Sequence, residues 1–155
     1  MSDSTLARQI KKTRAFELPQ EEAYLNLLRT MSVLLEPFER LLKEHGISEA
    51  KYNALRILRG AGGRGLPSLE IGVRMIQRVP DVTRIVDRLE VDGMVRRART
   101  NEDRRVVLVQ ITAKGLDLLS KLDAPVNALH RQQFPKLSRR ELDELNRLLV
   151  KAREM

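Results

Sequence analysis

The sequence predicts a mainly α-helical chain that carries one small β-hairpin, an α+β fold, and three observations support this prediction. Between residues 82 and 89, apolar side chains recur at i, i+3, i+4 and i+7, the spacing of one face of an amphipathic helix. Gly93 stands where that helix should end. A short strand opened by Met94 and Val95 and a β-branched return strand, residues 106–111, follow it around the turn residues 100–103. Long segments of helical apolar spacing flank this centre on both sides. A helix followed by an arginine-rich hairpin is the layout of a winged helix-turn-helix.

Composition favours a polyanion as a partner. The chain has 155 residues, and its 29 Lys+Arg against 21 Asp+Glu give a net charge of +8. Between residues 52 and 113 every basic residue is arginine, the side chain that binds phosphate and guanine bidentately. A GC-rich genome would produce the same bias, and a basic surface alone is equally consistent with an ordinary soluble protein.

Several classes of protein are disfavoured. The chain has no cysteine, which excludes disulfides, thiolate zinc sites and cysteine-based redox sensing. It lacks both a signal peptide and an apolar run of the roughly 18 residues that span a bilayer, so we expect a cytoplasmic protein without membrane contact. Neither a nucleophile–base pair nor a carboxylate dyad stands in a plausible cleft, so we expect no enzyme, cofactor or metal. His45 is expected to cap a helix rather than to bind a metal.

Both ends of the chain are predicted to be helical and to form a dimer interface. Residues 1–19 read as a flexible arm, with a possible short helix at Thr5 to Thr13, and 20–46 as a long helix with two apolar stripes. Residues 113–155 read as two further amphipathic helices, the second opened by the S-x-x-E capping box that begins at Ser138. We expect these ends to pack together and against a second copy. Prolines 37 and 125 are expected to kink the two longer helices.

Residues 47–112 are expected to form the winged helix-turn-helix itself. Ser48 should cap one helix, and Ser68 a second, Leu69 to Met75, with Leu69, Ile71 and either Val73 or Met75 in the core. Residues 80–92 should form the next helix, with Pro80 in its first turn. Residues 60–65, which are rich in glycine, lack the Lys-Ser/Thr of a phosphate-binding loop, so we expect a flexible linker.

Two motifs resemble the signature of the MarR-type transcriptional regulators: V-T-R-I-V-D-R-L-E-V-D-G-M-V-R-R from Val82, and N-E-D-R-R-V-V-L-V-Q-I-T-A-K-G from Asn101. The strong match runs from about residue 48 to 122. The resemblance implies a homodimeric winged-helix repressor whose first and last helices form the dimer interface, and which a small, often aromatic or anionic, ligand releases from DNA. It implies that Thr83 and Arg84 lie on the recognition helix. It also implies that Asp103 and Arg105 are the acid and the arginine of the wing tip, and that Thr112 and Gly115 begin the helix after the wing.

We expect the recognition helix to bind DNA chiefly through Arg84 and Arg88. The alternative is a solvated face on which these arginines form ion pairs with Asp81 and Asp87. Tyr52 lines a ligand pocket or, equally, belongs to the core. The expected DNA-binding residues are Ser68, Arg78, Pro80, Asp81, Thr83, Arg84, Asp87, Arg88, Arg99, Asp103, Arg104 and Arg105.

In the wing, Asp103 is expected to hold Arg105 extended for a narrow minor groove, unless both belong to an ordinary charged hairpin tip. Arg96, Arg97, Arg99 and Arg104 are expected to follow the DNA backbone. Asp87 with Glu90, and Glu102 with Asp103, read as ion-pair partners of arginines.

The sequence therefore predicts a dimeric, sequence-specific DNA-binding transcriptional regulator that acts on a pseudo-palindromic duplex, a repressor relieved by a small molecule. The alternative is a winged-helix protein-interaction module without specific DNA binding. The arginine-rich wing and the absence of an exposed apolar helix face argue against that alternative.

Overall fold

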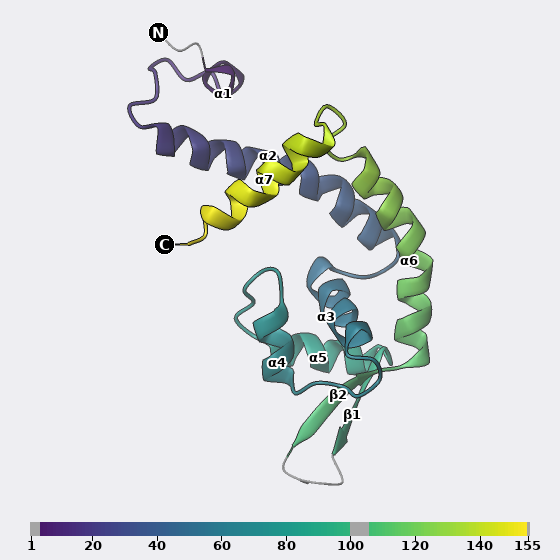
Figure 1. Ribbon diagram of the computed structural model, residues 1–155. Helices are drawn as coiled ribbons and strands as arrows, with labels where there is room; N and C mark the ends of the chain where they lie inside the picture. The colour runs from purple at the N-terminus through teal and green to yellow at the C-terminus, as the bar shows by residue number, and fades with distance from the viewer. Residues whose placement is uncertain (1–3, 100–105, 155) are drawn as a thin grey trace.

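The chain forms a compact lobe from which two long helices rise (Figure 1). This computed structural model describes residues 4–99 and 106–154. The elements in order are α1 (Thr5–Gln9), α2 (Pro19–Glu44), α3 (Glu49–Gly60), α4 (Ser68–Arg74), α5 (Val82–Val91), β1 (Val95–Arg99), β2 (Val107–Ile111), α6 (Ala113–Gln132) and α7 (Arg139–Lys151). The mainly helical fold with a two-stranded hairpin is confirmed.

An aliphatic core joins the lobe to the long helices. Its fully buried members come from α3, α4, α5, β2 and α6, and one residue, Leu42, comes from α2. Tyr52 lies in this core with its ring edge against Phe38, at 5.7 Å between ring centroids, and its hydroxyl accepts a hydrogen bond from Arg56 at 2.9 Å. Of the two roles expected for Tyr52, the structure therefore shows the core role.

The hairpin is antiparallel, with Val95 opposite Ile111 and Arg99 opposite Val107. Leu66 forms an isolated antiparallel bridge with Val109 of β2. The Leu66 N–H donates to the Val109 carbonyl at 3.0 Å, and the Val109 N–H donates to the Leu66 carbonyl at 2.8 Å. Gly65 precedes it at φ +76°, and a Cβ there would lie 2.7 Å from the Val109 carbonyl oxygen. The flexible linker predicted for residues 60–65 is therefore wrong at its end, where the chain is fastened to the wing.

Local signals placed most helix ends correctly. Ser48 and Thr112 cap α3 and α6, and Ser138 forms a full capping box with Glu141. His45 ends α2, with its ring Nδ1 2.9 Å from the Leu41 carbonyl oxygen.

Two predicted helix starts need correction. Ser68 is the first residue of α4, and the N-cap is Pro67, which makes no side-chain cap. Pro80 lies outside α5, because Asp81 is its N-cap. Helices α2 and α6 both continue through their prolines. In the turn before Pro37, the Leu34 carbonyl accepts a hydrogen bond from Gln133 at 3.2 Å.

Helix α4 differs most from its prediction. Ile71 and Met75 are buried, whereas Leu69 and Val73 are almost fully exposed. Leu69 was therefore wrongly assigned to the core. The helix also presents an exposed apolar face, whereas the sequence predicted that no helix would do so.

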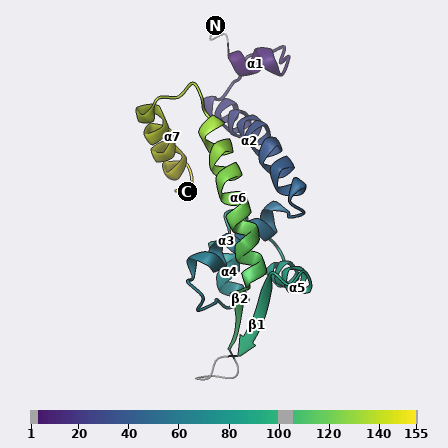
Figure 2. The ribbon, with the colours of Figure 1, turned by 90° about the vertical axis from the view of Figure 1, so that its right-hand side faces the viewer.

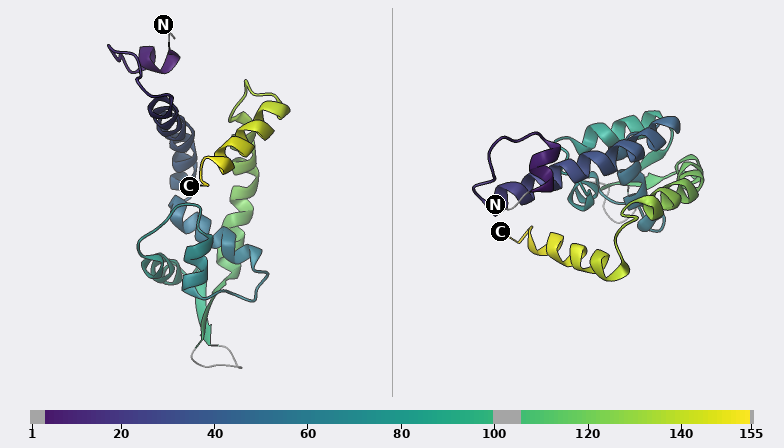
Figure 3. Two further views of the ribbon diagram at one scale, coloured as in Figure 1. Left: turned by 60° about the vertical axis from the view of Figure 1, so that its left-hand side comes forward. Right: turned by 90° about the horizontal axis from the view of Figure 1, so that it is seen from above.

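The two ends of the chain remain partly uncovered. Helix α7 buries no residue and is set apart from α2, as the view from above shows (Figure 3). Helix α2 exposes Tyr24, Leu28, Met31 and Val33. In the described part of the chain, no helix is both long and apolar enough to cross a membrane.

A bidentate ion pair fastens the lobe to α6. The two terminal guanidinium nitrogens of Arg59, Nη1 and Nη2, each lie 2.8 Å from a carboxylate oxygen of Asp123. The hydrogen bond from Arg59 lowers the pKa of Asp123 below its ordinary value of 3.8. A carboxylate with a lowered pKa in the folded state stabilises the fold above its ordinary pKa, and that contribution is lost as pH falls through the lowered value.

We expect Asp123→Asn to lower the free energy of unfolding at pH 7 by about 0.2–1 kcal/mol, the range for a partly exposed pair. The difference from the native chain should shrink as pH falls below about 4. Urea unfolding at pH 7 and pH 3 measures it. Asp143→Asn is the matched control, because its partner Arg139 is almost fully exposed. A difference that stays constant between the two pH values would contradict this assignment.

Candidate nucleic-acid interface

Helix α5 turns a polar face to solvent because its apolar stripe is buried. Val86 and Leu89 are completely buried, and Val82 and Ile85 pack against the same core. The opposite face exposes Thr83, Arg84, Asp87 and Arg88. The stripe predicted between residues 82 and 89 is thus confirmed, and with it the set of side chains on the outer face.

The two arginines of that face have no acidic partner in the described part of the chain. Asp81 Oδ1 accepts a hydrogen bond from the backbone N–H of Arg84 at 3.0 Å, so Asp81 caps the helix. Asp87 Oδ1 lies 2.5 Å from Arg97. The alternative in which Asp81 and Asp87 pair with Arg84 and Arg88 is therefore wrong, and both guanidinium groups are available to a polyanion.

Arg97 clamps the hairpin to α5. Its guanidinium bonds both Asp87 and Glu90, and its backbone N–H donates to Glu90 at 3.0 Å. The hydrogen bond to Asp87 and the pairing with Glu90 raise the pKa of Arg97. The expectation that Arg97 follows the DNA backbone is corrected, whereas the ion-pair reading of Asp87 and Glu90 is confirmed.

Strand alternation could have identified the role of Arg97. Val95 points into the core, so Arg97, two residues later, lies on the same face of the strand. That face turns toward α5, where Asp87 and Glu90 are spaced at i, i+3.

The end of α5 is held by two lysines. Lys51 Nζ lies 2.6 Å from Asp92 Oδ2, and Lys114 Nζ donates to the Asp92 carbonyl at 2.7 Å. Thr112 Oγ1 donates to the Gly93 carbonyl at 2.8 Å. Cations at a helix C-terminus offset its partial negative charge. Sequence reasoning missed these contacts, although the two lysines are those that bracket the segment in which every basic residue is arginine.

The turn between α4 and α5 is fastened to α3. The Ile76 N–H donates to Asn53 Oδ1 at 2.9 Å, and the Gln77 amide donates to Glu49 at 3.1 Å. Burial, reinforced by the nearby Glu39 carboxylate, raises the pKa of Glu49. These hydrogen bonds therefore hold the turn between α4 and α5 against α3.

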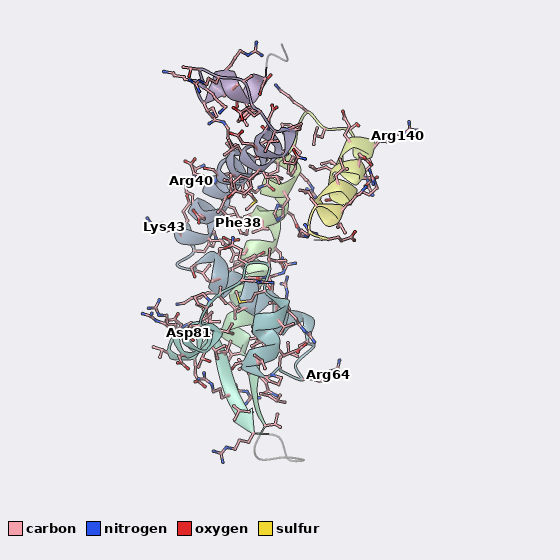
Figure 4. The ribbon with its side chains drawn as sticks, turned by 90° about the vertical axis from the view of Figure 1, so that its left-hand side faces the viewer. Phe38, Arg40, Lys43, Arg64, Asp81 and Arg140 are labelled. Atoms are coloured by element: carbon pink, nitrogen blue, oxygen red, sulfur yellow. The ribbon has the colours of Figure 1, made fainter. Side chains whose placement is uncertain are left out.

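Two depressions bring the predicted residues together. One, of about 490 Å³, lies between α4 and the start of α5. Its polar lining comes from Ser68, Arg78, Asp81 and Thr83, beside Pro80. The other, of about 340 Å³, is lined by Lys51 of α3 and by Asp81, Arg84 and Arg88. Figure 4 shows Asp81 at the start of α5, on the side of the molecule from which Arg40 and Lys43 of α2 also project.

The wing is described up to its tip. Arg96 and Arg99 are exposed on β1. Glu102, Asp103, Arg104 and Arg105 lie outside the described residues. Within residues 4–99 and 106–154, no cluster of three or more acidic or histidine side chains could hold a metal ion.

The sequence model of the MarR family matches residues 47–107 of this chain. The transcriptional repressor MprA of Escherichia coli (strain K12) is 30% identical over 155 residues, which cover 97% of this chain and 88% of the repressor. The crystal structure of a MarR transcription factor from Planctomyces limnophilus is 41% identical, with a TM-score of 0.66 over 88% of this chain and 98% of that one.

A more distant structure shares the fold. CouR from Rhodococcus jostii RHA1, solved bound to p-coumaroyl-CoA, has a TM-score of 0.72 at 22% identity and covers 86% of this chain and 93% of its own. Together with the full-length matches at 30% and 41% identity, and with the buried stripe and arginine-bearing face of α5, these comparisons show that the chain is a member of the MarR family of transcriptional regulators.

Proposed function

We propose that the chain represses transcription by binding a pseudo-palindromic operator as a homodimer. The observation that carries this proposal is the outer face of α5, on which Arg84 and Arg88 are exposed without an acidic partner in the described part of the chain. A helix fixed at its turn, its hairpin and its C-terminus presents these groups in a defined orientation. That is the requirement for reading base edges in a major groove.

The remaining basic residues supply affinity. Arg78 is exposed in the turn before α5 and Arg99 at the end of β1, and with Arg104 they are proposed to contact phosphates. Ser68 and Thr83 would add hydroxyl contacts. Arg105 is proposed to enter the minor groove beside Asp103. Since Asp87 is bound by Arg97, its proposed role is to support the helix rather than to touch DNA.

The uncovered ends support the dimer. Helix α7 carries its apolar side chains without burying any of them, and α2 exposes Tyr24, Leu28 and Met31. Exposed apolar surface of this extent marks a protein interface. A second copy that covers both helices would place two recognition helices on one duplex, with half-site centres about one turn, roughly 10 bp, apart.

A small molecule is proposed to relieve repression. Support comes from CouR, whose structure was solved with p-coumaroyl-CoA bound. In this chain, a depression of about 380 Å³ at the α2–α3 junction lies between the long helices and the lobe and is lined by Glu39, Lys43, Ile47 and Glu49. A ligand bound there would change the angle between the long helices and the lobe. A protein that acts on chromosomal DNA in this way would work in the cytoplasm.

The exposed apolar face of α4 keeps the protein-interaction module as a second candidate. A gel shift with the DNA upstream of the chain's own gene separates the two functions, because a module of that kind would give no specific shift.

The first DNA-binding prediction concerns Arg84. Arg84→Ala should weaken binding to the upstream DNA by about 1–3 kcal/mol and change the preferred base within the half-site. Arg140→Ala is the matched control, because it removes the same charge from α7, far from Asp81 (Figure 4). Fluorescence anisotropy with native and base-substituted duplexes measures both effects. Equal weakening by the two variants would show a general charge effect instead.

The wing prediction depends on whether removing the Asp103 carboxylate weakens or strengthens DNA binding. Arg105→Ala should weaken binding by about 1–3 kcal/mol per subunit and flatten the salt dependence. Asp103→Ala should also weaken binding, because Arg105 would lose the carboxylate that holds it extended. Simple electrostatics predicts the reverse when an acid near DNA is removed. Glu102→Ala controls for that charge effect, and a salt titration measures all three variants. Tighter binding by Asp103→Ala would exclude this role for the wing.

The dimer prediction uses α7. Light scattering at micromolar concentration should give twice the mass of the chain for the native protein. Leu148→Asp should shift it toward a monomer, because a carboxylate in an apolar interface loses its hydration. Val91→Asp, at an apolar residue exposed on α5, should remain a dimer. A stable folded monomer of the native chain would rule out the assembly.

A further inference from the structure

Helix α4 and the residues just after it present apolar side chains to solvent, and these side chains form the α4 stripe. On α4, Leu69 and Val73 are 81% and 75% exposed and follow each other at i and i+4, and Ile76, two residues beyond the end of the helix, is 85% exposed. The direction of this α4 stripe is fixed, because Ile71 and Met75 on the opposite face are buried and the Ile76 N–H is bonded to Asn53. Leu69 and Val73 on one helix face, with Ile76 just beyond the helix, form an exposed apolar patch of the kind that protein interfaces cover.

Leu69 and Val73 also line the depression that holds Ser68 and Thr83, but the backbone of a DNA bound there would not require apolar partners. Phosphates and sugars are contacted by charged and hydrogen-bonding groups, and the α5 face offered to DNA supplies such groups because it is polar and basic. The occupant of the α4 stripe must itself be apolar along a helix-sized strip.

The position of α4 points to a second copy of the chain. Seen from the side, α4 and α7 lie on the same side of α6, while α2 and α5 lie on the other (Figure 2). Helix α7 is one of the two helices proposed to bind the second copy, and a copy seated on α7 approaches the side on which α4 stands. In a two-fold dimer a surface near the axis meets the same surface of its partner.

The charges beside the stripe are self-complementary. Glu70 and Arg74 border it on one flank, with Arg74 Nε 2.8 Å from Glu70 Oε1, and both side chains remain nearly half exposed. When two identical helices pack antiparallel, the same flank of each meets its counterpart. Glu70 of one copy then faces Arg74 of the other, and Arg74 faces Glu70.

We propose that the two lobes of the homodimer bind each other through their α4 stripes, in a closed arrangement that competes with operator binding. This rests on the proposed dimer. Packed helices lie about 8–10 Å apart. With the two α4 helices in contact, three such closest approaches lead from one α5 to the other, which is on the order of 24–30 Å. Half-sites one turn apart require about 34–36 Å. The lobes must therefore separate to read the operator, and the closed population lowers the apparent affinity.

The chain has no cysteine, so a single introduced thiol reports on the contact. Light scattering first establishes the dimer. Val73→Cys, oxidised mildly without DNA, should form an intermolecular disulfide, and saturating operator DNA should suppress it. Val91→Cys is the matched control, because Val91 is 88% exposed but lies on α5. The oxidised Val73→Cys dimer should bind the operator at least tenfold more weakly and recover on reduction.

Charge reversal tests the orientation. Glu70→Arg should reduce cross-linking of Val73→Cys, because Arg then faces Arg, and the added Arg74→Glu should restore it. A dimer in which Val73→Cys cross-links no better than Val91→Cys overturns the lobe contact and leaves the dimer intact. A monomer overturns both. If oxidation of Val73→Cys leaves the operator affinity unchanged, the lobe contact does not compete with DNA. If adding Arg74→Glu to Glu70→Arg does not restore cross-linking, the antiparallel pairing is wrong.

Discussion

Burial of the apolar stripe of α5 is the interaction on which the interface depends. Val86 and Leu89 are completely buried, so the helix cannot rotate about its axis without exposing them. Burying two such side chains contributes roughly 3–6 kcal/mol. A rotation of one residue step would turn Arg84 and Arg88 away from the outer face. The core therefore sets which side chains reach a ligand, and the ion pairs of Arg97 and the lysine contacts at Asp92 prevent smaller movements.

The same core ties the lobe to the long helices. Leu119 and Leu122 of α6 are buried in the cluster that contains Leu55 and Val86. The start of α6 approaches the hairpin so closely that a Cβ on Gly115 would lie 2.5 Å from the Met94 carbonyl oxygen. Only a residue without a side chain fits there. The lobe and the base of α6 thus form one packed unit, even though the far ends of the helices are uncovered.

Sequence predicted the features that depend on neighbouring residues. Caps at Ser48, Thr112 and Ser138, and the stripe of α5, follow from spacings of three or four residues. Contacts across the chain were missed, because nothing local marks Lys51 as a partner of Asp92, 41 residues away. Helix α4 shows a different limit. In seven residues, Leu69 with Val73 and Ile71 with Met75 are both spaced at i, i+4, so periodicity could not choose the buried face.

The attachment of α6 has a mechanical consequence. Its base holds the end of α5 through Lys114, and its middle is fixed to α3 by the fork between Arg59 and Asp123. A helix of 20 residues is about 30 Å long. A tilt of about 5° applied at its far end, where α7 begins, moves a point that distance away by roughly 2–3 Å. That displacement is comparable to the length of a hydrogen bond, so α6 is a lever through which a small change of angle at one end becomes, at the other, a movement large enough to break such a bond.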